Sequence, residues 1–170
     1  MYKKIIFIFM ISISVILTGT SCGKSEKNTD SYKSSSEKTV SQNNPKKALE
    51  EIYKFVEIKG VEDGDKAFVT ETLGIDESYF SKFYIKKTDA KYGVADVYII
   101  EPTKGNTDKI VRALTSFRDR RALECKDYNI YNSYEIVQNA QIIARGEYIV
   151  MLMLEDTESA EEILKEYITG

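Results

Sequence analysis

The chain has 170 residues, with 24 basic and 27 acidic side chains and no histidine. This length suits one domain with short additions, and a net charge of −3 is unlike the basic surface that nucleic-acid binding requires. Without histidine, the chain has no Ser-His-Asp or Cys-His catalytic pair, no histidine-ligated metal site and no imidazole switch near neutral pH.

Residues 1–21 have the layout of a bacterial export signal. Lys3 and Lys4 precede an apolar run, and small residues follow at 18–21. The largely apolar stretch is about 15 residues long, shorter than the roughly 20 that a membrane-spanning helix needs. We therefore expect a signal peptide over residues 1–21 rather than a transmembrane anchor.

Cys22 is the predicted anchor. The segment Thr18-Gly19-Thr20-Ser21-Cys22 resembles a bacterial lipobox, in which the cysteine thiol receives a diacylglyceryl group. Gly19 stands where lipoboxes usually have leucine, which leaves the efficiency of processing open. A simple secretory signal with a coincidental cysteine is the alternative. Two acyl chains, at about 0.8 kcal/mol per buried CH2, hold a protein stably at a membrane. The sequence thus predicts a lipid-anchored protein on the outer face of the cytoplasmic membrane, with no cofactor besides this lipid.

Residues 22–44 combine the anchor with a polar tether. Ser, Lys, Glu, Asn and Thr dominate the segment. After Cys22, Val40 is the single aliphatic residue in it. Such a composition buries too little apolar surface to offset the entropy of ordering. As a flexible coil, about 22 residues span about 25 Å. We expect a disordered tether over 22–44 and a single folded domain over 45–170.

Apolar side chains then recur with helical or strand periodicity. Pro45 suits the first turn of a helix, and Gly146 suits the tight turn of a hairpin. Asp108 falls in the first turn of the longest helix, where the helix dipole favours an acid. The expected elements, in chain order, are helices at about 45–60 and 66–73, strands at 79–86 and 94–101, a helix at 107–125, strands at 140–145 and 147–154, and a helix at 156–167.

This order, α-α-β-β-α-β-β-α, predicts an α+β fold with a mainly antiparallel four-stranded sheet and packed helices. The last strand is apolar on both faces, which favours a central position with cover on each side. In the strand over 94–101, Val94, Tyr98 and Ile100 share one face with Asp96, so this acid is expected among apolar neighbours.

Several short segments carry a resemblance that covers about residues 73–168. They are Leu73-Gly74-Ile75-Asp76, Val97-Tyr98-Ile99-Ile100 followed by Pro102 and Lys104-Gly105, an arginine-bearing helix, and Tyr134-Glu135-Ile136-Val137-Gln138-Asn139-Ala140-Gln141 leading into Gly146-Glu147-Tyr148-Ile149-Val150. With these segments the chain resembles an uncharacterised family of small Gram-positive lipoproteins, one of the domains of unknown function. The resemblance implies the fold and an envelope location, and it implies no activity, cofactor or catalytic residue.

Two arginines fall on the apolar face of the predicted long helix. Arg118 and Arg121 share that face with Cys125. One interpretation is that their stems lie along apolar surface and their guanidinium groups reach the rim or pair with Asp96 or Glu135. The other is a receptor for a carboxylate or phosphate, which a guanidinium holds with two parallel hydrogen bonds. Arg118, Arg121 and Asp96 are therefore a candidate ion-pair or ligand site.

Three tyrosines lie close together in the loop expected after the long helix. Tyr128, Tyr131 and Tyr134 each offer a flat apolar face with a polar tip, as sugar or peptide grooves require. The alternative is that they pin the loop and cap a sheet edge. They form the candidate aromatic binding surface.

Other reactive side chains predict little chemistry. Cys125 has no histidine to lower its pKa, so we expect an inert core thiol. The segment Glu62-Asp63-Gly64-Asp65 lacks the alternating ligands of a calcium loop and is expected to be a solvated turn. The sequence predicts no catalytic residue and no metal site.

Together these features predict a non-catalytic lipoprotein of the bacterial cell envelope whose domain binds a partner or ligand. Its expected partners are membrane lipid, through Cys22, and an envelope protein or a small ligand, with no nucleic acid. One alternative is a lipoprotein that binds a small ligand, glycan or peptide in association with a transporter. A second alternative is a carboxylate-dependent hydrolase of the envelope.

Overall fold

Antiparallel strands form the middle layer of the computed structural model, which describes residues 43–170. The expected signal peptide, Cys22 and nearly all of the tether lie outside the described residues. Within residues 43–170 the sheet has five strands in the order β1-β2-β3-β5-β4. These strands are β1 (Val61–Asp63), β2 (Phe80–Thr88), β3 (Asp96–Pro102), β4 (Gln141–Arg145) and β5 (Tyr148–Met153).

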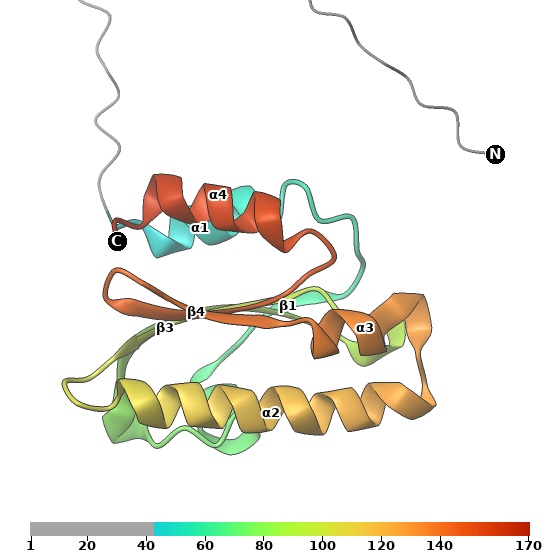
Figure 1. The fold of residues 1–170 in the computed structure, drawn as a ribbon, viewed down its shortest axis with the longest axis horizontal. Helices are drawn as coiled ribbons and strands as arrows, with labels where there is room; N and C mark the ends of the chain where they lie inside the picture. The colour runs from blue at the N-terminus through green and yellow to red at the C-terminus, as the bar shows by residue number, and fades with distance from the viewer. Residues whose placement is uncertain (1–42) are drawn as a thin grey trace, which may run out of the picture. The chain divides into compact units, whose positions relative to one another are not determined.

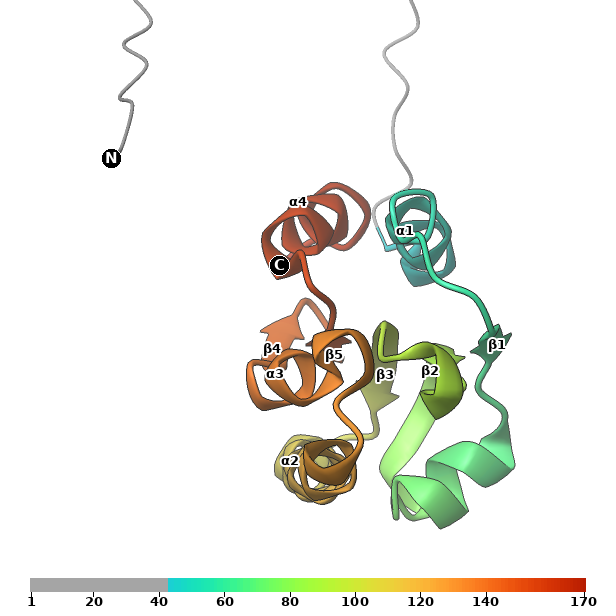
Figure 2. The same cartoon turned by 90° about the vertical axis from the view of Figure 1, so that its right-hand side faces the viewer.

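Helices cover both faces of this sheet (Figure 1). On one face α1 (Pro45–Ile52) and α4 (Thr157–Tyr167) lie side by side, and on the other lie α2 (Thr107–Asp127) and α3 (Ser133–Gln138) (Figure 2). The described residues also form a π-helical turn and three 3-10 turns, at Phe68–Thr72, Glu77–Tyr79, Ala90–Tyr92 and Ile130–Asn132. The α+β fold and its mainly antiparallel sheet are therefore confirmed. No helix within residues 43–170 combines the length and the hydrophobicity needed to span a bilayer.

The two central strands carry a core on each face. β5 is buried along its whole length, as its uninterrupted apolar sequence predicts. Its side chains alternate between two hydrophobic clusters: Ile149, Met151 and Met153 on the α2 side, and Tyr148, Val150 and Leu152 on the α1 and α4 side. Residues 43–170 contain a five-stranded sheet with a hydrophobic cluster on each face, so we expect this part of the chain to fold on its own.

Side-chain caps fix where the first and last helices begin. The side-chain amide oxygen Oδ1 of Asn44 accepts a hydrogen bond from the backbone N–H of Lys47 at 3.0 Å, and Pro45 occupies the first turn. At α4, the Asp156 carboxylate accepts from the backbone N–H of Ser159 at 3.0 Å. Both bonds satisfy backbone donors that a helix start leaves unpaired.

Four elements differ from the sequence prediction. The second helix, expected at 66–73, is a π-helical turn at Phe68–Thr72. β1 is too short to show a strand pattern, yet it pairs with β2 and makes the sheet five-stranded instead of four-stranded. The first helix ends at Ile52, and residues 53–60 leave it as an irregular connection. α3 forms in the segment expected to be a loop, directly after Tyr131 and Asn132, which adopt left-handed backbone angles.

Candidate functional site

A cavity of about 720 Å³ opens at one end of the domain. It lies between the connection that follows α1, the segment leading into β3, the region of α3 and the start of α4. Its apolar lining includes Ile52, Val56, Ile58, Ile136, Leu154 and Ile163. A largely apolar hollow of about 300–1,000 Å³ is typical of small-molecule sites in proteins.

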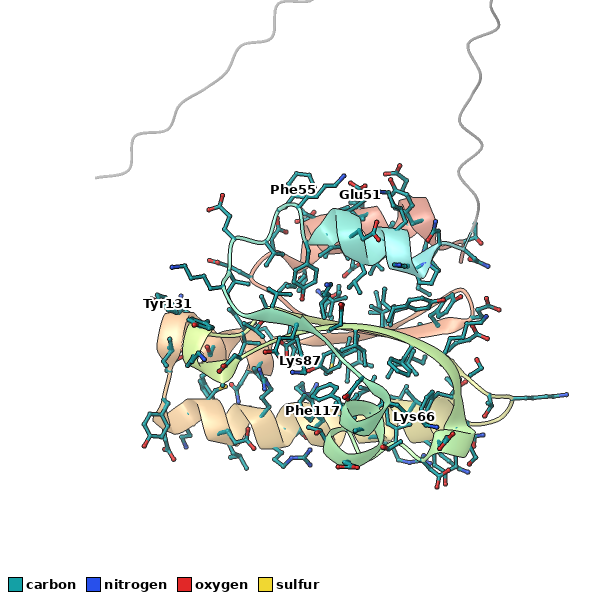
Figure 3. The ribbon with its side chains drawn as sticks, turned by 180° about the vertical axis from the view of Figure 1, so that it is seen from behind. Glu51, Phe55, Lys66, Lys87, Phe117 and Tyr131 are labelled. Atoms are coloured by element: carbon teal, nitrogen blue, oxygen red, sulfur yellow. The ribbon has the colours of Figure 1, made fainter. Side chains whose placement is uncertain are left out.

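Three aromatic side chains border this cavity. Phe55 is 75% exposed, Tyr92 is 36% exposed and Tyr131 is 78% exposed. Figure 3 shows Phe55 just beyond α1 and Tyr131 near the same end of the molecule. Large aromatic groups left in water are the side chains on which binding surfaces most depend. The cavity with these three rings is hereafter called the aromatic cavity.

The backbone that carries two of these rings is unusual. Tyr131 has φ 50° and ψ 47°, and Asn132 follows with φ 59°. A bulky residue in this left-handed region is strained, and such strain concentrates at functional sites. Gly93, next to Tyr92, has φ 104°, a backbone conformation that L side chains rarely adopt. The strain therefore belongs to Tyr131, whereas the turn beside Tyr92 uses a glycine, which adopts its positive φ at little cost.

We expect Tyr131→Gly to be more stable than Tyr131→Ala. Glycine avoids a left-handed penalty of about 1–2 kcal/mol. Its freer unfolded state offsets about 0.4–1 kcal/mol of that gain. The free energy of unfolding from urea titrations should therefore be higher for the glycine variant by roughly 1 kcal/mol, with an upper limit of about 1.6 kcal/mol. Equal stabilities would show that position 131 carries no backbone strain.

Charged side chains also border the aromatic cavity. Glu57 comes from the connection after α1, and Glu155 and Asp156 come from the connection into α4. Among the lining residues that the structure describes, Lys59 is the single basic one, against these three acids. Hydrogen bonds from Ser159 hold the pKa of Asp156 below its usual value, so this carboxylate stays ionised in neutral solution.

A second cluster of interest is buried under α2. Asp96 is fully buried. One carboxylate oxygen accepts the backbone N–H of Thr88 at 2.8 Å, and the other accepts the hydroxyl of Tyr98 at 2.8 Å. Arg121 lies beside the second oxygen, with its Nη2 atom 3.3 Å away. The structure thus brings Asp96 and Arg121 together as an ion pair.

This ion pair lacks an aligned hydrogen bond. The Nε and Nη2 atoms of Arg121 are buried, and neither has a hydrogen-bond partner among the described residues. The guanidinium instead lies 5.9 Å from the centre of the Phe117 ring, close enough for a cation–π interaction. Since one partner is fully buried and the other is 15% exposed, neither charge is well solvated.

The Asp96 carboxyl should make stability depend on pH. Burial raises its pKa, against the opposing effects of Arg121, Tyr98 and Thr88. A raised pKa means that the folded state holds the proton to higher pH than the unfolded chain does. This contribution to stability is complete below about pH 4 and is lost as pH rises through the folded-state pKa. We expect the free energy of unfolding of the wild type to fall relative to Asp96→Asn over that range. Parallel pH curves would contradict this assignment.

Arg118 does not join the buried cluster. Its guanidinium pairs with the neighbouring Asp119 at 2.7 Å, and its side chain is 29% exposed. Arg121 follows Arg118 by three positions on α2, and the structure places Arg118 at the rim and Arg121 against Asp96. Of the three residues of the candidate ion-pair site, the structure therefore unites two.

The three tyrosines do not form one surface. Tyr131 borders the aromatic cavity. Tyr128 is 79% exposed and borders a different hollow of about 330 Å³, next to Arg121 and Cys125. Tyr134 is partly buried and packs against the core cluster on the α2 side. The candidate aromatic surface is thus divided among three environments.

Cys125 and the acidic segment around Glu62 lie in surroundings that support the fold rather than a reaction. Burial raises the pKa of the Cys125 thiol, which makes it a weak nucleophile at neutral pH. Glu62 pairs with Lys87 across β1 and β2, and Asp63 pairs with Lys86. No group of three or more metal-ligating side chains occurs within residues 43–170.

Sequence reasoning missed Phe55 and Tyr92 as binding residues. The helical pattern after Pro45 continues past Ile52, so it placed Phe55 on a core face. The sequence does contain a glycine, Gly60, in the connection after α1. The structure shows why a glycine is needed there, because a Cβ at this position would lie 2.3 Å from the Tyr92 ring. The close approach of that glycine to the ring shows how the connection after α1 reaches the aromatic cavity.

Comparison with known proteins places the chain in a family without adding an activity. No curated protein and no solved structure matches it. A family model matches residues 54–154, a span that contains Asp96, Arg121 and the three rings of the aromatic cavity. The chain belongs to the family described as a domain of unknown function (DUF4358).

Proposed function

We propose that this protein is a membrane-anchored lipoprotein of the bacterial cell envelope and that its domain is a non-catalytic binding module. The aromatic cavity is the observation that carries the proposal. Its volume of about 720 Å³, apolar floor and exposed rings suit the capture of an apolar ligand group. A Gram-positive source fits the family resemblance and belongs to the same proposal.

The chemistry near the cavity supports binding over catalysis. The chain has no histidine to act as a general base near neutral pH. The buried ionisable groups Asp96, Tyr98 and Arg121 contact one another, and none of them lines the cavity. These three groups therefore lie apart from the cavity, out of reach of a molecule bound in it.

The start of the described chain and the aromatic cavity lie at opposite ends of α1. Asn44 precedes α1, and its backbone N–H bonds to the carbonyl oxygen of Tyr167 at the end of α4. Phe55 and the aromatic cavity lie past the other end of α1 (Figure 3). The described chain therefore enters the domain at the end of α1 that lies away from the aromatic cavity.

The anchor is tested by Cys22→Ser in cells. We expect the wild-type chain in the membrane fraction, labelled by a palmitate analogue, and the variant unlabelled and lost from that fraction. Ser21→Ala is the matched control, because it changes the neighbouring side chain and keeps the thiol. Retention of the Cys22→Ser chain in the membrane at unchanged mass would refute lipid anchoring.

Binding in the cavity is tested with the neutral fluorescent probe N-phenyl-1-naphthylamine. The protein is the chain from residue 22 onward with Cys22→Ser, so that no detergent competes. Ser159 lines the cavity and is exposed, so Ser159→Phe should obstruct it and weaken probe binding at least tenfold. Glu158→Phe, at the adjacent exposed position outside the lining, should bind like the wild type. Equal affinity in both variants would contradict a binding role for this cavity.

An accessory subunit that docks on an envelope protein is the second candidate. It is favoured by the exposure of Phe55 and Tyr131, 75% and 78%, because rings this exposed can also insert into a partner. The two candidates use the same face of the domain, and they differ in whether the bound molecule is small or a polypeptide.

A further inference from the structure

We infer that the aromatic cavity selects an organic cation, a small ligand with an apolar body and an ammonium head. This inference rests on the proposed function and names the ligand class of the same site. It follows from the combination of ring faces, carboxylates and an uncharged floor that the described residues bring together.

The three rings are suited to a cation. Phe55, Tyr92 and Tyr131 come from three separate segments and border one cavity. The face of an aromatic ring carries negative charge density and attracts an ammonium group within about 6 Å. One of these three rings already makes such a contact, since the ammonium nitrogen of Lys91 lies 4.9 Å from the centre of the Tyr92 ring.

The charged groups of the lining favour the same sign of ligand. Three carboxylates, of Glu57, Glu155 and Asp156, border the cavity from two connections, against the single ammonium of Lys59 among the described lining residues. Asp156 stays ionised because Ser159 donates to it. A positive ligand head therefore meets attractive charge near the mouth, and a negative head meets repulsion.

The floor suits the apolar body of such a ligand. Ile52, Leu154 and Ala160 are buried at the base of the cavity and carry no polar side-chain atoms. An apolar body placed there loses its contact with water, while an ammonium head can remain at the rim with the carboxylates. A fatty acid or an anionic lipid fits the floor equally well but places its negative head beside the three acids.

Three probes of similar size separate charge from apolar fit. They are benzyltrimethylammonium, neutral benzyl methyl sulfone and phenylmethanesulfonate, titrated calorimetrically into the chain from residue 22 onward with Cys22→Ser. We expect the cation to bind at least tenfold more tightly than either of the others. Raising the ionic strength should reduce this preference, because salt screens the rim carboxylates.

Matched variants assign the preference to the cavity. Tyr131→Leu keeps apolar volume but removes a ring face, so the cation preference should fall at least threefold. Tyr128→Leu changes an equally exposed tyrosine outside the cavity and should leave the preference intact. Glu155→Gln should weaken cation binding several-fold without affecting the neutral probe, while Glu158→Gln, outside the lining, should not.

The possible results separate this inference from the proposed function. Equal affinity for the cation and the neutral probe, or tighter binding of the sulfonate, would overturn the cation selectivity and leave the binding role standing. The same holds if none of the three probes binds while N-phenyl-1-naphthylamine still does. If neither the three probes nor N-phenyl-1-naphthylamine binds, both proposals fail.

Discussion

Replacing Arg121 by methionine is expected to lower the free energy of unfolding by about 3–5 kcal/mol. Methionine fills much of the space of the arginine stem but leaves the fully buried carboxyl of Asp96 without its positive partner. Hydrogen bonds from Thr88 and Tyr98 remain, and they do not replace the lost charge. Urea denaturation at neutral pH measures the loss, which should shrink at acidic pH because Asp96 then binds a proton.

Two comparisons isolate the ion pair in this prediction. Adding Asp96→Asn to Arg121→Met removes the unpaired charge and should restore a large part of the lost stability. Arg118→Met changes the other arginine on the same helix, whose exposed pair with Asp119 contributes less than about 1 kcal/mol. If Arg121→Met and Arg118→Met have equally small effects, Arg121 does not compensate a buried charge.

Phe117→Ala is expected to cost a similar amount, about 3–5 kcal/mol. The ring is 5% exposed and packs edge-on against Phe68, with 6.2 Å between the ring centres. It also lies 5.9 Å from the centre of the Tyr98 ring and 5.9 Å from the Arg121 guanidinium carbon. Truncation therefore opens a cavity within the core and removes one wall of the buried ion pair.

The size of the Phe117 effect is checked by equilibrium urea denaturation. Phe117→Leu retains most of the volume and should be clearly less destabilising than Phe117→Ala. Leu123→Ala, at a position on the same helix that is 69% exposed, should change the free energy of unfolding by less than about 0.5 kcal/mol. A Phe117→Ala cost no larger than that of Leu123→Ala would mean that the aromatic cluster is not part of the stabilising core.

Periodicity was sufficient to predict the central elements of this fold. β5 is apolar at every position, and such a segment is stable only between two covering layers. The alternation in β3 correctly placed Asp96 on the same face as Tyr98, beneath α2. Both strands could be predicted from the sequence because the faces that they bury determine the spacing of their apolar residues.

β1 and the segments that frame the aromatic cavity could not be read in this way. β1 has three residues, too few for alternation to be visible, and is specified by its pairing with β2. The end of α1 at Ile52 depends on tertiary packing, since apolar spacing continues beyond it. Tyr131 reaches the cavity through a left-handed backbone angle, which no periodic pattern encodes.

The candidate ion pair shows the limit of helical-wheel reasoning. A helical wheel places Arg118 and Arg121 on the same face of α2. It gives the direction in which a side chain leaves the helix, but not how deeply that side chain is buried. The position of β3 beneath the helix decides that Arg121 contacts Asp96 while Arg118 stays at the rim with Asp119. That depth is a property of the packed layers and requires the structure.

If the aromatic cavity is the face of this protein that binds in the cell envelope, site-specific photocrosslinking in living cells should capture the bound molecule there. A photoreactive aromatic residue is placed at position 55, beside the cavity, and at position 123, an exposed site on α2 outside its lining. We expect a product of defined mass at position 55 that is lost in Cys22→Ser and in Ser159→Phe. Equal crosslinking at positions 55 and 123, or a position 55 product unaffected by both substitutions, would contradict it.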